Sequence, residues 1–278
     1  MSEPFLTSGF GDEAGSTIEE QIQAIKSARL GGIDIRSVDN VNVLDLTIYQ
    51  LADVKQKCSD AGVRIQSVGS PVNKVSMAKE TPKAEQDRLQ KAIHAANNLG
   101  TRTVRIFTPE APSESWGEIK ELMQSMIVMA EASDILLLHE NDGKYFAAYP
   151  ENAKRLFEEL GSPLFRAAFD FANTVIIGYK PLRDWFPWIL PYIHTLHMKD
   201  ARSGSGEVVA CGDGDAEIVE TLKFMIDKGW HGVLTLEPHL KASGPLGGYS
   251  GPEMFNYATS KMKDCLKAAG GEPEEVSY

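Results

Sequence analysis

The fold is decided by four segments of the second half of the chain: Ile135-Leu-Leu-Leu-His-Glu140, Phe165-Arg-Ala-Ala-Phe-Asp170, Ile193-His-Thr-Leu-His197 and Val233-Leu-Thr-Leu-Glu237. Each is a mostly apolar run that ends on a side chain able to bind a metal ion. Short apolar runs of this kind are typical of buried parallel strands. Turn-forming or polar residues and then a helical pattern follow each run, so the four candidate ligands lie where strands end. Barrels of alternating strands and helices carry their active sites there.

Strand-like and helix-like patterns alternate in the first half of the chain as well. Strands are predicted at residues 5–9, 33–36, 63–68 and 103–107, and helices at 17–29, 47–61, 83–99 and 118–132. Gly31-Gly32 is expected to cap the first helix. Eight strands in 278 residues leave about 35 residues per unit, enough for a βα repeat.

This pattern predicts a single α/β domain, a (β/α)8 TIM barrel over residues 1–270, followed by a polar, loose tail at 271–278. Loops rich in Gly and Ser at 203–207 and 243–251 are expected to lie over the active face. A doubly wound open sheet is the alternative. No Gly-x-Gly-x-x-Gly run follows the first strand to support it.

Composition limits the partners. Asp plus Glu number 39 against 28 Lys plus Arg, a formal net charge of −11, which disfavours nucleic acid. The three cysteines are too few and too scattered for a disulfide framework, so a reducing compartment is expected. No signal peptide is expected from the first residues, and no apolar run of about 18 residues is found in the sequence. We expect a soluble cytoplasmic protein that binds no membrane.

The four strand-end residues Glu140, Asp170, His197 and Glu237 are predicted to bind one divalent cation. They are 30, 27 and 40 residues apart, so consecutive strands would each supply one ligand. Three carboxylates and one imidazole suit Mn²⁺ or Mg²⁺ best, with Co²⁺ and Zn²⁺ as alternatives. Glu140 and Glu237 could also act as acid and base on opposite faces of a carbon. The competing interpretation is that each residue is only the first solvated position after a strand.

Basic residues near the same strand ends have two interpretations. Arg36, Lys74, Arg105 and Lys199 could bind a carboxylate, a phosphate or an enediolate oxygen of a substrate. Alternatively, the arginines pair with nearby acids such as Asp12, Glu13 or Asp200. His239 is expected near the mouth of the barrel, where it touches substrate or supports a loop. His139 and His194 are expected to face the helices instead.

The chain resembles the xylose isomerase-like, sugar phosphate isomerase/epimerase family of TIM barrels. The strings that carry the resemblance are His139-Glu140-Asn141, Phe169-Asp170-Phe-Ala-Asn173, His197-Met-Lys199-Asp200, Gly212-Asp-Gly214-Asp, Leu236-Glu237-Pro238-His239-Leu240, Asp12-Glu13, Asp34-Ile-Arg36, Ser70-Pro71-Val-Asn-Lys74 and Val104-Arg105-Ile-Phe107.

The resemblance implies roles for individual residues. Glu140, Asp170, His197 and Glu237 match the family's metal ligands, and the two glutamates match those that move a proton on and off the sugar carbon. Asn173 stands where related ketose epimerases have a histidine, and an amide can bind a hydroxyl but cannot take up a proton. The resemblance also leaves a homo-oligomer open.

Four functions remain open at this stage. The leading hypothesis is a metal-dependent isomerase or epimerase of a sugar or a keto-sugar or inositol derivative, acting by glutamate-mediated proton transfer through an enediolate. A lyase or dehydratase acting on a keto sugar or inosose begins with the same proton abstraction. An endonuclease for abasic DNA shares the fold, but the charge of −11 and the six histidines argue against it. The last is a non-catalytic sugar-binding barrel.

Overall fold

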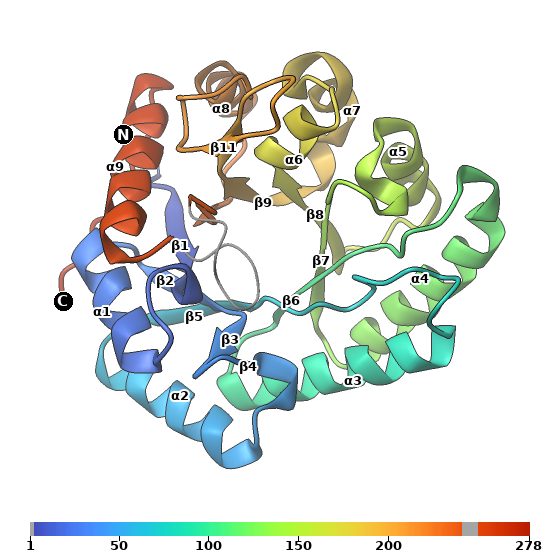
Figure 1. Cartoon of the computed structure of the whole chain (residues 1–278), viewed down its shortest axis with the longest axis horizontal. Coiled ribbons are helices and arrows are strands. Elements are labelled where there is room, and N and C mark those ends of the chain that lie inside the picture. Colours follow the sequence, from blue (N-terminus) through green and yellow to red (C-terminus); the bar gives the residue numbers. More distant parts are fainter. Residues whose placement is uncertain (1–2, 241–249) are drawn as a thin grey trace.

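The computed structural model describes residues 3–240 and 250–278, and in these stretches eight parallel strands close into one barrel (Figure 1). The order around the barrel is β1-β12-β9-β8-β7-β6-β5-β2. The predicted (β/α)8 barrel is confirmed. The barrel strands are β1 (Leu6–Phe10), β2 (Gly32–Ile35), β5 (Arg64–Val68), β6 (Thr103–Ile106), β7 (Leu136–Glu140), β8 (Phe165–Asp170), β9 (Ile193–Met198) and β12 (Val233–Leu236).

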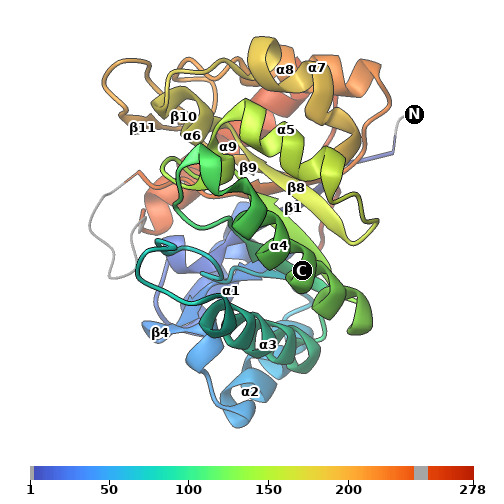
Figure 2. The same ribbon diagram turned by 90° about the vertical axis from the view of Figure 1, so that its right-hand side faces the viewer.

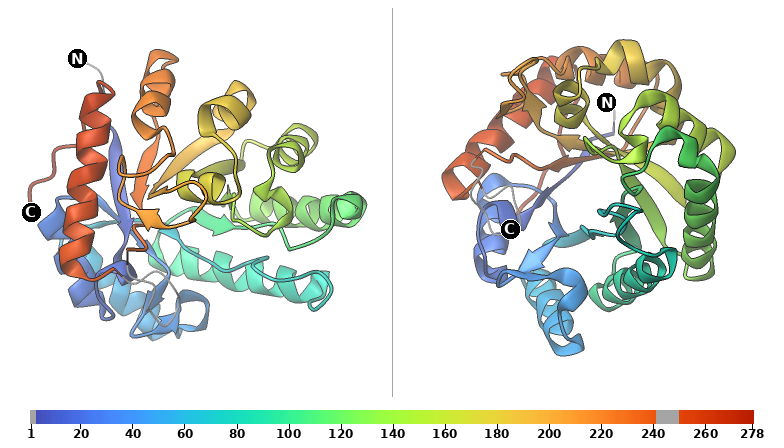
Figure 3. Two further views of the ribbon diagram at one scale, coloured as in Figure 1. Left: turned by 45° about the horizontal axis from the view of Figure 1, so that its top comes forward. Right: turned by 45° about the vertical axis from the view of Figure 1, so that its right-hand side comes forward.

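Helices form a ring around the strands, as Figure 3 shows. Thr17 and Thr47 begin the first two helices with reciprocal capping boxes, which satisfy free backbone N–H groups. The helices are α1 (Ile18–Ala28), α2 (Ile48–Asp60), α3 (Pro82–Leu99), α4 (Trp116–Ala132), α5 (Pro150–Glu159), α6 (Phe171–Ile176), α7 (Phe186–Ile189), α8 (Ile218–Asp227) and α9 (Pro252–Ala268). The helices predicted in the first half lie within two residues of these bounds.

The end of α1 differs from the prediction. Arg29, not the Gly31-Gly32 pair, adopts the left-handed conformation that ends the helix, with φ of 51°. Gly32 already belongs to β2. Gly31 is small for another reason: a Cβ at this position would collide with the carboxylate of Glu274 from the end of the chain. The glycine therefore allows a close approach and does not act as a cap.

Two short hairpins lie beyond the strand ends of the barrel, and neither was predicted from the sequence. They consist of β3 (Ser37–Val38) with β4 (Val41–Asn42), and β10 (Asp200–Ala201) with β11 (Val208–Val209). β4 and the β10–β11 hairpin project on the same side of the barrel in Figure 2. The predicted loop at 203–207 connects β10 and β11. Of the other predicted loop, at 243–251, residues 243–249 lie outside the described residues.

The tail predicted to be loose is packed against the barrel. Glu274 accepts a hydrogen bond from Thr7 N at 2.7 Å and pairs with Arg64, whose Nη2 lies 3.1 Å from its Oε1. The Tyr278 hydroxyl donates to Leu30 O. The tail is ordered because these partners at the start of the strands satisfy its polar groups. In the two described stretches, no helix combines the length and apolar character needed to cross a bilayer.

Candidate active site

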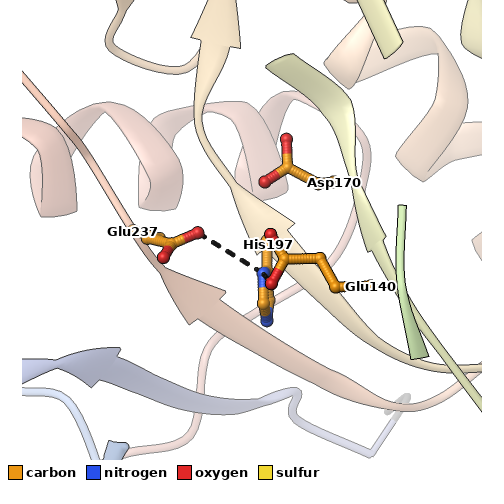
Figure 4. Close-up of side chains that lie close together, drawn as sticks. All are labelled: Glu140, Asp170, His197 and Glu237. Atoms are coloured by element: carbon orange, nitrogen blue, oxygen red, sulfur yellow. Dashed lines mark ion pairs between the residues drawn. The ribbon is translucent and has the colours of Figure 1, made fainter. Parts of the chain in front are cut away.

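The barrel brings the four predicted ligands together at the ends of four neighbouring strands. Glu140 and Asp170 are the last residues of β7 and β8, His197 lies near the end of β9, and Glu237 directly follows β12. The parallel register pairs Asp170 with His197. Their ligand atoms lie within 4.8 Å of one another, and all four residues are buried. Figure 4 shows Glu140 and Glu237 approaching the His197 ring from two sides, with Asp170 nearby.

Two atoms of this cluster make ion pairs with their neighbours. His197 Nδ1 and Asp170 Oδ2 are both buried and are held by ion-pair contacts: Asp170 Oδ2 lies 2.7 Å from Lys199 Nζ, and His197 Nδ1 lies 3.4 Å from Glu140 Oε2 and 3.5 Å from Glu237 Oε2. Asp170 uses its other oxygen to accept from Asn173 N at 2.8 Å. Three carboxylates with one imidazole form a suitable donor set for a hard divalent cation. The residues therefore fit the predicted metal ion.

Two buried cations neutralise the carboxylates of the cluster. Lys199 Nζ lies 2.7 Å from Asp170 Oδ2 and 2.9 Å from Glu237 Oε2. Arg105 Nη1 lies 3.1 Å from Glu140 Oε2 and 3.5 Å from Glu237 Oε1. Because removing charges from water is costly, both cations and their acids depend on this mutual pairing.

Arg36 connects the cluster to a second pair of acids. Its Nε lies 2.8 Å from Asp12 Oδ2, its Nη2 lies 2.8 Å from Glu13 Oε1 and its Nη1 lies 3.0 Å from Glu237 Oε1. The predicted pairing of Arg36 with Asp12 and Glu13 is present. Burial raises the pKa of Glu13 to about 7, although the charge of Arg36 opposes the shift.

Asp200 does not pair with either arginine, contrary to one of the two interpretations. Its carboxylate accepts hydrogen bonds from the backbone N–H groups of Ala201, Gly212, Gly214 and Ala216. It thereby fixes the loop after β11, and a Cβ on Gly214 would collide with it. The Gly-Asp-Gly-Asp string is thus a structural loop around Asp200.

The buried acids differ in their tendency to ionise. Burial raises the pKa of Asp170. Burial acts in the same direction on Glu140, but the charges of His197 and Arg105 outweigh it and hold the pKa of Glu140 below its usual range. For His197, burial would lower the pKa, but the charge of Glu140 raises it to about 10. The pKa shifts thus favour the charged forms of Glu140 and His197 and disfavour the charged form of Asp170.

A cavity of about 370 Å³ opens over the cluster, a size suited to a small molecule. All six predicted substrate-binding residues line it: Arg36, Lys74, Arg105, Asn173, Lys199 and His239. Glu140 and Glu237 line it too. Asn173 Nδ2 donates to Glu140 Oε1 at 3.4 Å, and His239 Nε2 lies 3.3 Å from Glu237 Oε1.

Other lining residues were missed from the sequence. Asn42, Gly69, Pro71 and Asp142 also line the cavity, and Asp142 Oδ2 lies 2.9 Å from Lys74 Nζ. Asn42 belongs to a hairpin too short to show a pattern. Asp142 could have been found, because it follows Glu140 at the same strand end.

The two histidines excluded as ligands point away from the site. His139 packs edge-on against Phe157 of α5, and burial lowers its pKa to about 4. His194 Nδ1 lies 2.8 Å from Thr195 Oγ1. Both therefore serve packing, as the alternation of side chains along a strand predicts.

Comparison with known proteins gives a family, a curated relative and a shared fold. The family described as xylose isomerase-like TIM barrel matches residues 22–256. A 2-epi-5-epi-valiolone 7-phosphate 2-epimerase from Actinoplanes sp. is 27% identical over 171 residues, which cover 59% of this chain and 60% of that protein. The match thus spans less than two thirds of the relative's length.

Two solved structures share the whole fold at low sequence identity. A D-tagatose 3-epimerase-like protein superposes with a TM-score of 0.76 at 14% identity, covering 95% of this chain and 98% of that one. A probable 3-DHS dehydratase from Bacillus anthracis superposes with a TM-score of 0.73 at 12% identity, covering 94% and 98%. At such identities the likeness establishes the fold alone.

Proposed function

The chain belongs to the xylose isomerase-like TIM barrel family, as its sequence motifs predicted, and we propose that it is a divalent-metal-dependent isomerase or epimerase of a sugar, keto-sugar or cyclitol derivative. One observation carries this proposal: Glu140 and Glu237 reach a common cavity from the ends of β7 and β12, on two sides of a buried cluster of three carboxylates and one imidazole that could hold a metal ion. The Actinoplanes relative is named as an epimerase, which supports the same class of reaction.

The proposed chemistry is proton transfer at a carbon beside a carbonyl. A divalent cation bound by Glu140, Asp170, His197 and Glu237 would supply positive charge to the substrate oxygens next to that carbon. One glutamate removes the proton from carbon, and the bonding electrons move into the carbonyl to give an enediolate. The other glutamate, which has taken up a proton from solvent, then gives it to the opposite face of the same carbon, which inverts that centre. Delivery to the neighbouring carbon, together with movement of a hydroxyl proton between the two oxygens of the enediolate, isomerises the sugar.

The basic residues of the cavity have a matching role. Arg105 and Lys199 hold the two glutamates in place and favour their ionised form, which the glutamate that removes the proton requires. The other glutamate carries a proton when it acts as the acid. Both also line the cavity, where their fixed charges can stabilise negative charge that develops on oxygen. Asn173 donates to Glu140 and can bind a hydroxyl, but it cannot exchange a proton. The proton chemistry is therefore assigned to the glutamates.

The test is solvent deuterium incorporation into a panel of keto sugars, inosose and phosphorylated cyclitols in the presence of Mn²⁺. Glu140→Gln and Glu237→Gln should each lower the rate at least 100-fold, because the amide cannot accept the proton. Glu253→Gln, an exposed acid on α9, is the matched control and should exchange normally. Full exchange in both cavity variants would refute the assignment.

Product mass separates the reactions that share this first step. An isomerase or epimerase conserves the mass of the substrate, whereas a dehydratase lowers it by one water. Loss of water would move the assignment to the lyase alternative while keeping both glutamates. Binding without any exchange across the panel would favour the non-catalytic sugar-binding barrel.

A further inference from the structure

A second cavity, of about 430 Å³, adjoins the candidate active site. The two cavities share Asn42, Pro71 and Lys74 in their walls. The second one extends outward between the segment that follows β4 and helix α3, which contribute Asp45 and Lys91. The second cavity therefore borders the first at Lys74.

The second cavity is basic in an otherwise acidic protein. Lys74, Arg88 and Lys91 line it together with one acid, Asp45. Each of the three cations also faces an acid, Lys74 with Asp142, Arg88 with Glu85 and Lys91 with Asp45, and two of these acids lie outside the lining. Three cationic side chains gathered in one cavity can supply donors to an anion.

The cations of this cavity keep donors available for a ligand. Lys91 Nζ lies 3.7 Å from Asp45 Oδ1, which is too long for a hydrogen bond. Arg88 is anchored through its Nη1, which donates to the carboxylate of Glu85, and Glu85 is buried and also accepts from Asn73 N. The side chain of Arg88 is 32% exposed. Its Nε and Nη2 make no hydrogen bond with any residue of the described stretches.

Lys74 is fixed between the two cavities. Its Nζ lies 2.9 Å from Asp142 Oδ2 and 4.8 Å from the centre of the Phe107 ring. It is 44% exposed, so its remaining N–H groups can reach a ligand that passes from one cavity into the other. An anchored lysine at this boundary suits a group that enters the second cavity while the rest of the molecule stays in the first.

We propose that the second cavity binds a phosphate monoester carried by the substrate, with Lys74, Arg88 and Lys91 as its ligands. This rests on the proposed function, which places the reacting carbons of the same molecule over Glu140 and Glu237. A phosphate monoester carries a charge of about −1.5 to −2 at neutral pH and three acceptor oxygens, so it can contact all three cations, whereas a carboxylate offers one charge and two oxygens. Its oxygens also suit the planar donors of a pre-positioned arginine.

The test is calorimetric binding of three probes to the metal-free protein: D-fructose 6-phosphate, D-fructose and D-gluconate. The phosphorylated sugar should bind at least tenfold more tightly than fructose. Arg88→Gln with Lys91→Gln should remove most of that preference, because each charged hydrogen bond contributes about a tenfold change in affinity. The control variant, Lys83→Gln with Arg102→Gln, removes two exposed charges outside both cavities and should keep the preference.

The outcomes separate this inference from the proposed function. Equal binding of fructose and its phosphate, or tighter binding of gluconate than of the phosphate, would overturn the phosphate site even if deuterium exchange occurs with unphosphorylated sugars. A phosphate preference that disappears in the cavity variant and survives in the control supports the site even if no exchange is found. Glu237→Gln should leave the phosphate preference intact, because Glu237 does not line the second cavity.

Discussion

The two ends of the barrel differ in how their buried polar groups are paired. At the carboxyl end, where the strands finish, buried acids and bases form one network, in which Asp170 Oδ2 and His197 Nδ1 are held by ion-pair contacts. At the amino end, where the strands begin, polar groups form hydrogen bonds with the C-terminal tail and with neighbouring loops. Glu274 accepts from Thr7 N, and Trp230 Nε1 donates to Ile193 O at 2.9 Å.

The difference indicates what each end contributes. Burying charged groups is costly even when they are paired, so the carboxyl end contributes less to the folding free energy than its many contacts suggest. At the amino end, hydrogen bonds are combined with aromatic packing, such as the stacking of Phe5 on His231 at 4.4 Å between ring centres. Substitutions at the first end should change binding and catalysis, and substitutions at the second should change stability.

The largest effect is expected for metal binding at the carboxyl end. Asp170→Asn replaces a buried anionic ligand and should weaken Mn²⁺ affinity at least about 1000-fold, since loss of one partner of a buried charge pair costs several kcal/mol. The metal-free protein should lose some stability as well, because Lys199 loses one of its two buried carboxylate partners, but the loss is limited because Glu237 remains as the other. Calorimetric titration with Mn²⁺ measures the affinity.

Glu274→Gln at the amino end is the control for that experiment. It should bind Mn²⁺ like the unmodified protein. If Asp170→Asn binds Mn²⁺ normally, the four residues are not a metal site. The carboxyl end would then differ from the amino end in its pairing but not in metal binding.

The next effect is a pH dependence of stability that originates at Glu13. Its pKa is about 7 in the folded protein against a usual 4.5, so between these values the folded state binds more protons and the unfolding free energy decreases as pH rises. In the metal-free protein Glu13 should contribute a loss of about 3 kcal/mol over this interval. Glu13→Gln should remove that contribution.

Urea unfolding of both proteins at pH 4.5 and pH 7.5 measures this. The stability of Glu13→Gln relative to the unmodified protein should rise with pH. An unchanged difference between the two would show that Arg36 fully compensates the buried charge of Glu13, and the carboxyl end would then be less destabilised than the comparison implies.

The sequence predicted the carboxyl end well because its features repeat. Each ligand follows a strand of similar length, and parallel strands deliver their last residues to one rim, so Glu140, Asp170, His197 and Glu237 could be placed together from spacing alone. The pairing of Arg36 with Asp12 and Glu13 was one of two interpretations of the sequence and is present, but the partners of Arg105 and Lys199 were not predicted. Whether Lys199 reaches Asp170 or Asp200 depends on side-chain direction and on the loop after β11, which the periodicity does not specify.

The amino end was predicted poorly because its contacts are long-range. Glu274 meets Thr7 across 267 positions of the chain, and the polar composition of residues 271–278 suggested a loose tail. The same contact explains the wrong cap of α1, since Gly31 was assigned to the helix end when its small size serves Glu274. The second cavity was also missed, because the two-residue strands β3 and β4 have no periodic pattern.

Removal of the Glu274 carboxylate should cost about 2 kcal/mol of unfolding free energy without changing metal affinity. Glu274→Ala removes the carboxylate that accepts from Thr7 N and pairs with Arg64. Hydrogen bonds to a charged group contribute about 1.5 to 3 kcal/mol. Urea unfolding is the measurement. A loss below about 0.5 kcal/mol would mean that water replaces the carboxylate and that the tail does not stabilise this end.

The smallest effect tests whether the tail and Gly31 act as one unit. Gly31→Ala places a methyl group against the Glu274 carboxylate and should cost about 1 kcal/mol by overpacking. Gly161→Ala, whose added Cβ would meet nothing within 4 Å, is the control and should change stability by less than about 0.5 kcal/mol. Combined with Glu274→Ala, the Gly31 substitution should cost almost nothing further, because the group it collides with is gone. Additive losses in this double-mutant cycle would show that the two residues do not interact, and Gly31 would then require a purely local explanation in the turn before β2.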